Sequence, residues 1–134
     1  MISATKLWYI AYRYPKIRPV IQKAMRLLYS CDVSAPQKMG GGNFLEHNGL
    51  GVVISKMVII GSNCRIYQHT TIGAGKGGYP VLGNNVVIYG NTTICGKITI
   101  GNNVTIGANS FVNKDIPNNV IVGGCPAKIL KYNK

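Results

Sequence analysis

Acidic side chains are scarce in this sequence. Three Asp and Glu residues face 15 Lys and Arg residues over 134 positions, so the formal charge is +12. A field of this sign attracts polyanions, which include nucleic acids, phosphorylated cofactors, acidic polysaccharides and anionic membrane surfaces. The sequence has no basic run and no recognisable nucleic-acid-binding motif. We therefore do not expect a nucleic-acid partner.

Long apolar runs and closely spaced cysteines are also lacking. The longest early apolar run, residues 7–12, is too short for a secretory signal core and far too short to span a bilayer. Any membrane contact is therefore expected to be peripheral. The cysteines lie about 30 residues apart without the pairing typical of metal sites, at Cys31, Cys64, Cys95 and Cys125. We expect reduced, structural thiols in a cytoplasmic protein.

What the sequence does contain is an aliphatic residue at every sixth position. The period crosses a four-residue insertion between Ile72 and Leu82. A period of six fits neither a helix nor one continuous strand, but it fits short strands separated by turns, with three sides closing an 18-residue coil. The position two before each anchor is small or branched, so both should point inward. The anchors are Ile54, Ile60, Ile66, Ile72, Leu82, Ile88, Ile94, Ile100, Ile106 and Val112.

The turn residues between these strands repeat with the spacing of one coil. Asn84-Asn85 and Asn102-Asn103 lie 18 residues apart and should stack on neighbouring coils. Thr70-Thr71 and Thr92-Thr93 lie 22 residues apart, which is one coil plus the insertion. Hexapeptide repeats of this form predict a parallel β-helix. We expect the corners to need a positive φ at the glycines that follow anchors, namely Gly61, Gly73, Gly83, Gly101 and Gly107.

Residues 1–30 have a different character, with aromatic and basic side chains interleaved. Pro15 and Pro19 break any single helix, so the sequence predicts helices near residues 3–13 and 19–29. These helices can be an interfacial anchor at the membrane surface, or a cap over apolar side chains and strand edges at the open end of the β-helix. We favour a cap over residues 1–30, followed by a β-helix domain over residues 31–134.

One histidine lies where the repeat is interrupted. The six-residue phase slips by three between Leu45 and Ile54, which predicts a bulge at residues 46–51, and His47 lies in it. Asp32 lies 15 residues earlier, at the start of the preceding coil, so the two side chains can approach. A carboxylate on one imidazole nitrogen makes the histidine a general base. The alternative is a histidine that only hydrogen-bonds within its turn.

These features resemble the hexapeptide acyltransferases, whose β-helix is left-handed. Residues 31–131 resemble serine acetyltransferases and, more broadly, acyltransferases that modify polysaccharide or nucleotide-sugar hydroxyls. Residues 32–34 stand at the family's Asp-Ile-His stretch, and residues 46–54 match its Asp-His-x-x-Gly-Ile-Val-Ile segment. The family's catalytic Asp and His thus correspond to Asp32 and His47. The left hand is implied by the family, because general crossover rules favour the right hand.

Two departures from the serine acetyltransferases concern the acceptor. Those enzymes carry an Arg-His-Pro that helps to hold serine, whereas Tyr79 precedes Pro80 here in a shorter Gly-rich loop. Glu46 replaces an Asp that contacts the amino acid. We therefore expect the acceptor to be a sugar or polysaccharide precursor, with serine as the alternative. Glu46, Tyr79 and His69 are the candidate substrate-binding residues, although His69 lies on a corner and is favoured as a turn residue.

The resemblance also implies acetyl-CoA as the donor, with its pantetheine arm in a groove between subunits. Gly90 and Ala108 align with positions whose backbone meets that arm, and small residues permit close approach. Asn113 and Lys114 lie in a segment that resembles Thr-Lys-Asp-Ile-Pro, and Lys128 ends a Gly-x-Pro-Ala-Lys/Arg motif. The lysines can offset phosphate charge, or remain solvated surface residues.

The implied chemistry is direct transfer from acetyl-CoA to a hydroxyl, with His47 removing the proton and backbone N–H groups stabilising the oxyanion. No metal is expected, because two histidines per chain do not supply the three that bind zinc in a carbonic anhydrase of this fold. The family implies a homotrimer with three shared sites. A β-helix scaffold without catalysis is the alternative of a different class.

Overall fold

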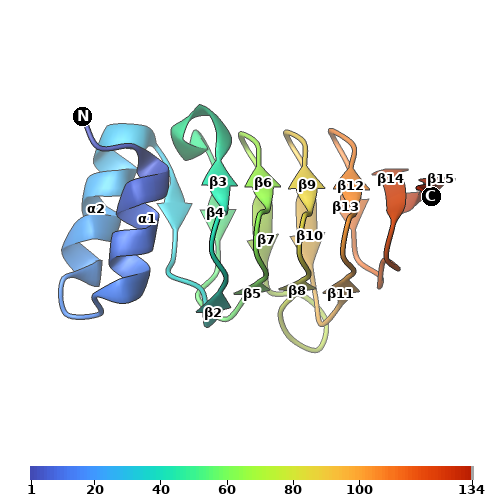
Figure 1. Cartoon of the computed structure of the whole chain (residues 1–134), viewed down its shortest axis with the longest axis horizontal. Helices are drawn as coiled ribbons and strands as arrows, with labels where there is room; N and C mark the ends of the chain where they lie inside the picture. Colours follow the sequence, from blue (N-terminus) through green and yellow to red (C-terminus); the bar gives the residue numbers. More distant parts are fainter. Residues whose placement is uncertain (134) are drawn as a thin grey trace.

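The computed structural model describes residues 1–133. Two helices lead into a three-sided stack of short strands (Figure 1). The elements are α1 (Ala4–Arg13), α2 (Arg18–Tyr29), β1 (Asp32–Val33), β2 (Lys38–Met39), β3 (Phe44–Leu45), η1 (Glu46–Gly49), β4 (Val53–Ile54), β5 (Ile59–Ile60), β6 (Arg65–Ile66), β7 (Thr71–Gly73), β8 (Val81–Leu82), β9 (Val87–Ile88), β10 (Thr93–Cys95), β11 (Thr99–Ile100), β12 (Thr105–Ile106), β13 (Phe111–Val112), β14 (Val120–Gly124) and β15 (Ala127–Tyr132).

Each strand pairs with the strand one coil away, so that three sheets form the sides of a prism. Sheet A has the order β1-β4-β7-β10-β13, sheet B β11-β8-β5-β2 and sheet C β15-β14-β12-β9-β6-β3. All pairs are parallel except β14 with β15. Thr71 lies opposite Thr93, which is the 22-residue spacing predicted from the insertion. The prediction of a left-handed parallel β-helix is confirmed.

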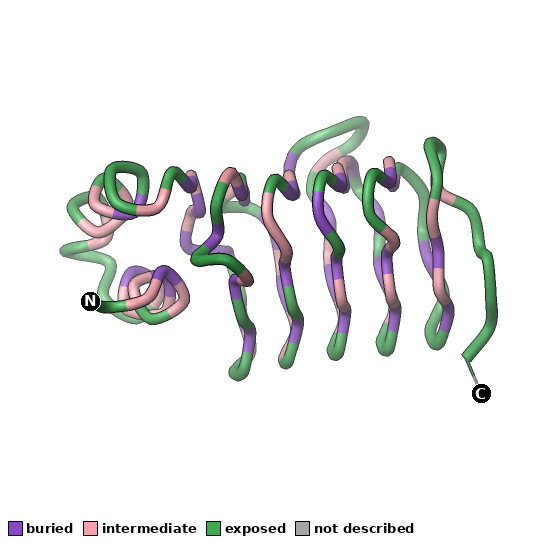
Figure 2. The backbone as a smooth tube through the Cα atoms, turned by 90° about the horizontal axis from the view of Figure 1, so that it is seen from above, coloured by how far each residue is buried: buried purple, intermediate pink, exposed green. Residues whose placement is uncertain are grey.

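The core is a column of side chains inside the prism. Every anchor from residue 54 to 112 is buried, and so are the positions two before them, including Cys64, Thr70 and Thr92. Buried and exposed residues alternate along each side (Figure 2). The earlier phase at Val33 and Leu45 is buried as well. The inward-facing positions predicted from the six-residue period are therefore confirmed.

The corners do not use glycine as the sequence predicted. The glycines after the anchors have no positive φ; the left-handed residue is the third after the anchor, usually Asn, as at Asn85 (φ 57) and Asn103 (φ 57). Asn accepts this conformation because its short polar side chain bonds locally. Glycine follows the anchor for another reason. A Cβ on Gly61 would lie 2.4 Å from the carbonyl oxygen of Gly83 on the next coil.

The helices α1 and α2 pack over the first coil of the prism. Trp8 and Met25 are fully buried and belong to the same core as Val33. The indole Nε1 of Trp8 donates to the carbonyl oxygen of Ser34 at 3.0 Å, and the Tyr9 hydroxyl donates to that of Gly40 at 2.8 Å. Both helices begin and end close to the predicted residues. Within residues 1–133, no helix has the length and apolarity needed to cross a bilayer.

Candidate active site

His47 lies in a short 3₁₀ turn, η1, at the edge where the chain passes from sheet C to sheet A. His47 and Asn48 both have φ near 53, a left-handed conformation that few side chains adopt. The turn is held by α1 on both sides, since Leu45 N–H donates to Thr5 Oγ1 at 3.0 Å and Ala4 N–H donates to Asn48 Oδ1 at 3.1 Å. The imidazole of His47 is consequently exposed on a fixed backbone.

A column of aromatic rings continues from His47 along this edge. The His47 ring meets Tyr67 edge-on with centroids 6.2 Å apart, and Tyr67 packs against Tyr89 at 4.9 Å. Neither tyrosine was predicted from the sequence. They lie 22 residues apart, so the spacing of the threonine pairs was a signal that could have found them.

An ion pair lies directly beside the histidine. Arg65 Nη1 is 2.9 Å from Glu46 Oε1, and the Glu46 side chain is only 19% exposed. The Arg65 guanidinium also lies 5.9 Å from the centroid of the Phe44 ring, whose residue pairs with it across β3 and β6. Arg65 and Tyr67 flank the inward-facing Ile66, so both point outward on the same side. The ion pair and the imidazole therefore share one surface.

Asp32 lies close to the end of the same loop but is engaged elsewhere. It is the first residue of β1 and pairs with Val53, while the N–H of Gly51 donates to the carbonyl oxygen of Ser30. The Oδ1 atom of Asp32 accepts hydrogen bonds from Arg26. Within residues 1–133, no hydrogen bond joins Asp32 to His47. The predicted neighbourhood of the two segments is present, whereas the predicted carboxylate–imidazole bond is not.

Other candidates lie on this edge as packing elements. His69 is a left-handed turn residue (φ 56) whose N–H donates to Leu50 at 2.8 Å. Its imidazole lies against Gly51, where an added Cβ would be 2.0 Å from His69 Nδ1. Gly90 is buried against the side chain of Gln68, 2.6 Å from where its Cβ would be. Ala108 is exposed one coil further on.

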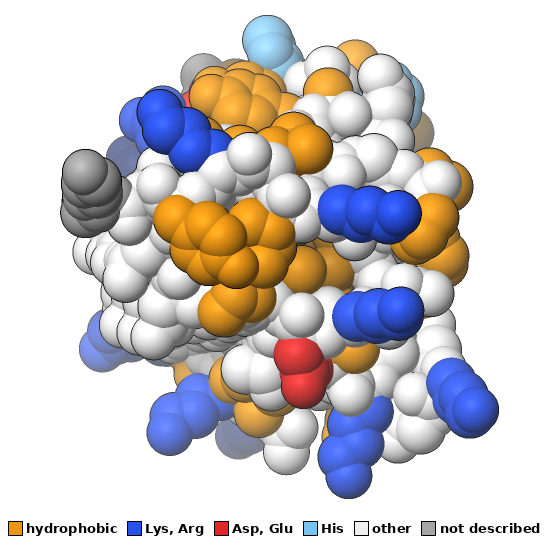
Figure 3. Space-filling model, turned by 90° about the vertical axis from the view of Figure 1, so that its right-hand side faces the viewer, with side chains coloured by type: hydrophobic (Ala, Val, Ile, Leu, Met, Phe, Trp, Pro, Cys, Tyr) orange, Lys and Arg blue, Asp and Glu red, His pale blue; other side chains and the backbone are white. Residues whose placement is uncertain are grey.

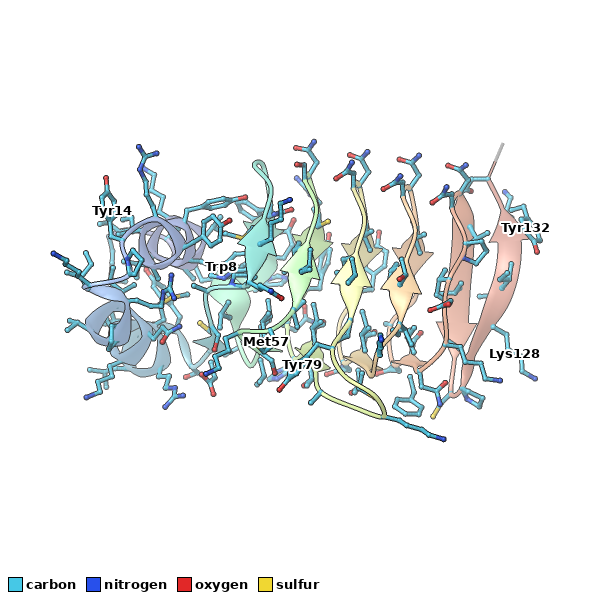
Figure 4. The ribbon with its side chains drawn as sticks, turned by 90° about the horizontal axis from the view of Figure 1, so that it is seen from below. Trp8, Tyr14, Met57, Tyr79, Lys128 and Tyr132 are labelled. Carbon is cyan, nitrogen blue, oxygen red and sulfur yellow. The ribbon has the colours of Figure 1, made fainter. Side chains whose placement is uncertain are left out.

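The remaining candidates lie away from His47 within one chain. The loop with Tyr79 joins sheet A to sheet B, and Asn113 and Lys114 follow β13 of sheet A at that same edge. Lys128 is on β15, near the C-terminal end, and Figure 4 shows it far from Tyr79 along the prism. The structure thus divides the predicted site between two edges.

The edge between sheets A and B carries its own cleft of about 370 Å³. Lys76, Lys97 and Asn113 contribute polar side chains to it, and Cys95 and Phe111 also line it. No acidic residue lines the cleft among those that the structure describes. Two ammonium groups in such a hollow favour an anionic ligand.

The cysteines do not supply a nucleophile beside His47. Burial raises the pKa of the Cys31 thiol to about 11, with a further contribution from the Asp32 carboxylate. Burial likewise raises the pKa of Cys64. Both thiols therefore stay protonated near neutral pH, and a thiol is a poor nucleophile. Within residues 1–133, no three His, Cys, Asp or Glu side chains are grouped to hold a metal ion.

Comparison with known proteins defines the class. The family described as bacterial transferase hexapeptide (six repeats) matches residues 79–114. Together with the prism and its period, this shows that the chain belongs to the hexapeptide-repeat acyltransferase family.

Within that family, the similar proteins are serine acetyltransferases. The one from Synechococcus elongatus is 38% identical over 128 residues, covering 92% of this chain and 52% of the relative. That from Buchnera aphidicola is 36% identical over 133 residues, covering 96% and 50%. The crystal structure of the Neisseria gonorrhoeae enzyme has a TM-score of 0.86 at 30% identity, covering 98% and 54%. A serine acetyltransferase structure in complex with CoA has a TM-score of 0.84 at 26% identity, covering 95% and 55%. The chain therefore spans about half the length of these relatives.

Proposed function

We propose that this chain is an acetyl-CoA-dependent O-acetyltransferase whose acceptor is serine. The similar proteins are named for serine, and one is a complex with CoA. These names favour serine, the alternative of the sequence analysis, over the sugar hydroxyl that Tyr79 and Glu46 had suggested.

The observation that carries the choice of acceptor is the ion pair of Glu46 and Arg65 beside His47. Serine carries an ammonium and a carboxylate at neutral pH, whereas a neutral sugar carries neither. A carboxylate and a guanidinium already 2.9 Å apart present both complementary charges, and the planar guanidinium fork fits a carboxylate in particular. The pair therefore supports an amino acid whose hydroxyl reaches the neighbouring imidazole.

The exposed imidazole of His47 accounts for the chemistry. In its neutral form it removes the proton from the serine hydroxyl while the oxygen attacks the thioester carbonyl. The C–S bond then breaks, and the imidazolium returns the proton to the departing thiolate. Asp32 stabilises the transient positive charge from the neighbouring strand. Tyr67 holds the imidazole from its edge.

The division of the candidate residues between two edges supports a shared site. His47, Glu46 and Gly90 lie where sheet C meets sheet A, whereas Lys76 and Lys97 lie where sheet A meets sheet B. In a ring of three chains, the edge between sheets A and B of one chain can lie against the edge between sheets C and A of its neighbour. This contact brings the two groups of residues together, and the closed ring repeats it three times. In this arrangement the two lysines balance the CoA phosphates. Light scattering that gives a monomer under assay conditions contradicts it.

The test is thiol release from acetyl-CoA with L-serine, with serinol, which lacks the carboxylate, and with a panel of neutral sugars. We expect L-serine to have the highest kcat/KM and mass spectrometry to detect O-acetylserine. His47→Asn keeps a residue that accepts a left-handed φ and removes the base, so its rate should fall about 10²–10⁴-fold. A sugar preferred over serine contradicts the acceptor, and an undiminished rate in His47→Asn contradicts the base.

A further inference from the structure

The helix α2 has apolar side chains on two faces, and only one is used by the fold. Met25 is buried in the core, with Ile21 and Tyr29 partly buried on the same side. A second set, spaced three or four residues apart, forms a stripe on the outside of the helix. We call this stripe the outer face of α2; it consists of Ile17, Val20, Ala24, Leu27 and Leu28.

The apolar side chains of the outer face are largely exposed to solvent. Leu27 is 85% exposed and Val20 is 71% exposed. Figure 1 places α2 at the end of the prism, where it packs beside α1 and against β1. Figure 2 shows exposed residues along its outer turns. Contiguous apolar surface of this kind marks an interaction site.

The charges around the stripe are all positive. Residues 1–31 contain six Lys and Arg residues and no Asp or Glu. Lys23 borders the outer face on the helical projection, and Lys16 lies in the turn just before α2. Two of the other cations are engaged within the protein, because Arg26 binds Asp32 and Arg18 donates to the carbonyl oxygen of Ala11. Lys6 and Arg13 belong to α1, so Lys16 and Lys23 are the cations that we assign to a ligand of this face.

We propose that the outer face of α2 binds an anionic membrane surface, with the helix lying in the interface. Apolar residues enter the boundary between headgroups and acyl chains while the bordering lysines meet lipid phosphates. A second copy of this chain fits the face less well. Self-association would bring Lys16 and Lys23 of two copies together between chains of charge +12. An anionic surface neutralises the same charges.

This proposal does not depend on the acetyl acceptor, and it is tested with the full chain and lipid vesicles. We expect cosedimentation with vesicles of phosphatidylcholine mixed with phosphatidylglycerol, little with phosphatidylcholine alone, and weaker binding at high salt. Leu27→Glu should reduce binding more than about tenfold, and Lys23→Gln about fivefold. Circular dichroism should show both variants folded, and neither substitution should change the acetyltransferase rate without lipid.

The opposite end of the prism provides matched controls. Leu130 is 68% exposed on β15, and Lys131 follows it. Strand β15 is at the C-terminal end of the prism, which faces the viewer in Figure 3. Leu130→Glu and Lys131→Gln should leave vesicle binding unchanged. Equal losses from Leu27→Glu and Leu130→Glu would overturn the proposal, as would failure of the wild type to bind anionic vesicles. A doubled mass in light scattering that Leu27→Glu abolishes would also overturn it, by making the face a protein interface.

Discussion

Arg26 binds Asp32 through two hydrogen bonds to a single oxygen. Its Nε and Nη2 lie 3.1 Å and 2.8 Å from Asp32 Oδ1. The side chains are 63% and 47% exposed, so the pair contributes about 1 kcal/mol or less to stability. Arg26 of α2 thus contacts the carboxylate that the family resemblance assigns to catalysis.

Substitutions in this pair separate catalysis from structure. Asp32→Asn removes the charge that supports the imidazolium and should lower kcat by at least about tenfold, within the range of general-base effects. Arg26→Gln removes only an exposed partner, and kcat should stay within about twofold because exposed ion pairs contribute little. The measurement is steady-state kinetics with L-serine. Equal losses in the two variants would mean that Asp32 acts only by holding the helix.

A second prediction concerns Arg65, which faces the proposed acceptor. Arg65→Gln should raise KM for L-serine about tenfold or more, because a charge-assisted hydrogen bond to the substrate is lost. KM for acetyl-CoA should not change. The preference for L-serine over serinol should shrink by the same factor, because serinol has no carboxylate that Arg65 could bind. A uniform fall in activity with both acceptors would instead indicate damage to the loop around His47.

A third prediction concerns the corner ladder of asparagines. The Asn103 side chain accepts from Asn85 Nδ2 at 3.2 Å and donates to Asn119 Oδ1 at 2.9 Å, while its backbone has φ 57. Asn103→Ala should cost about 1–2 kcal/mol, because Ala is strained in the left-handed region. Asn103→Gly loses the same side-chain bonds without the strain and should unfold at a higher temperature than the Ala variant. Coincident thermal melts would show that strain is not the cause.

The pH dependence of stability follows from Cys31. Its pKa rises from 9.0 to about 11 on folding because the thiol is buried. Between these values the unfolded thiol loses its proton first, so the free energy of unfolding falls as pH rises and the contribution is complete below pH 9. Cys31→Ala should flatten this fall in urea titrations across the window. The exposed Cys125 is the control, and Cys125→Ala should retain the wild-type slope.

The period of six was enough to predict the prism, the strand register and the inward residues, because the same positions of every coil are buried inside the prism. It could not show which corner residue is left-handed, since Gly61 and Asn63 both lie in the turn and only stacking distances distinguish them. The pair of Arg26 and Asp32 was missed because it joins a helix to the first coil, outside the repeat. Glu46 was predicted to bind the substrate, but its partner Arg65 was missed because the bulge breaks the arithmetic there.

Two hydrogen bonds join α1 to the turn around His47, because Thr5 Oγ1 accepts from Leu45 N–H and Ala4 N–H donates to Asn48 Oδ1. They fasten the residues on either side of Glu46 and His47 to the same ten-residue rod. A tilt of α1 would move Asn48, which is the residue directly after His47. The position of the His47 backbone is therefore tied to the position of α1.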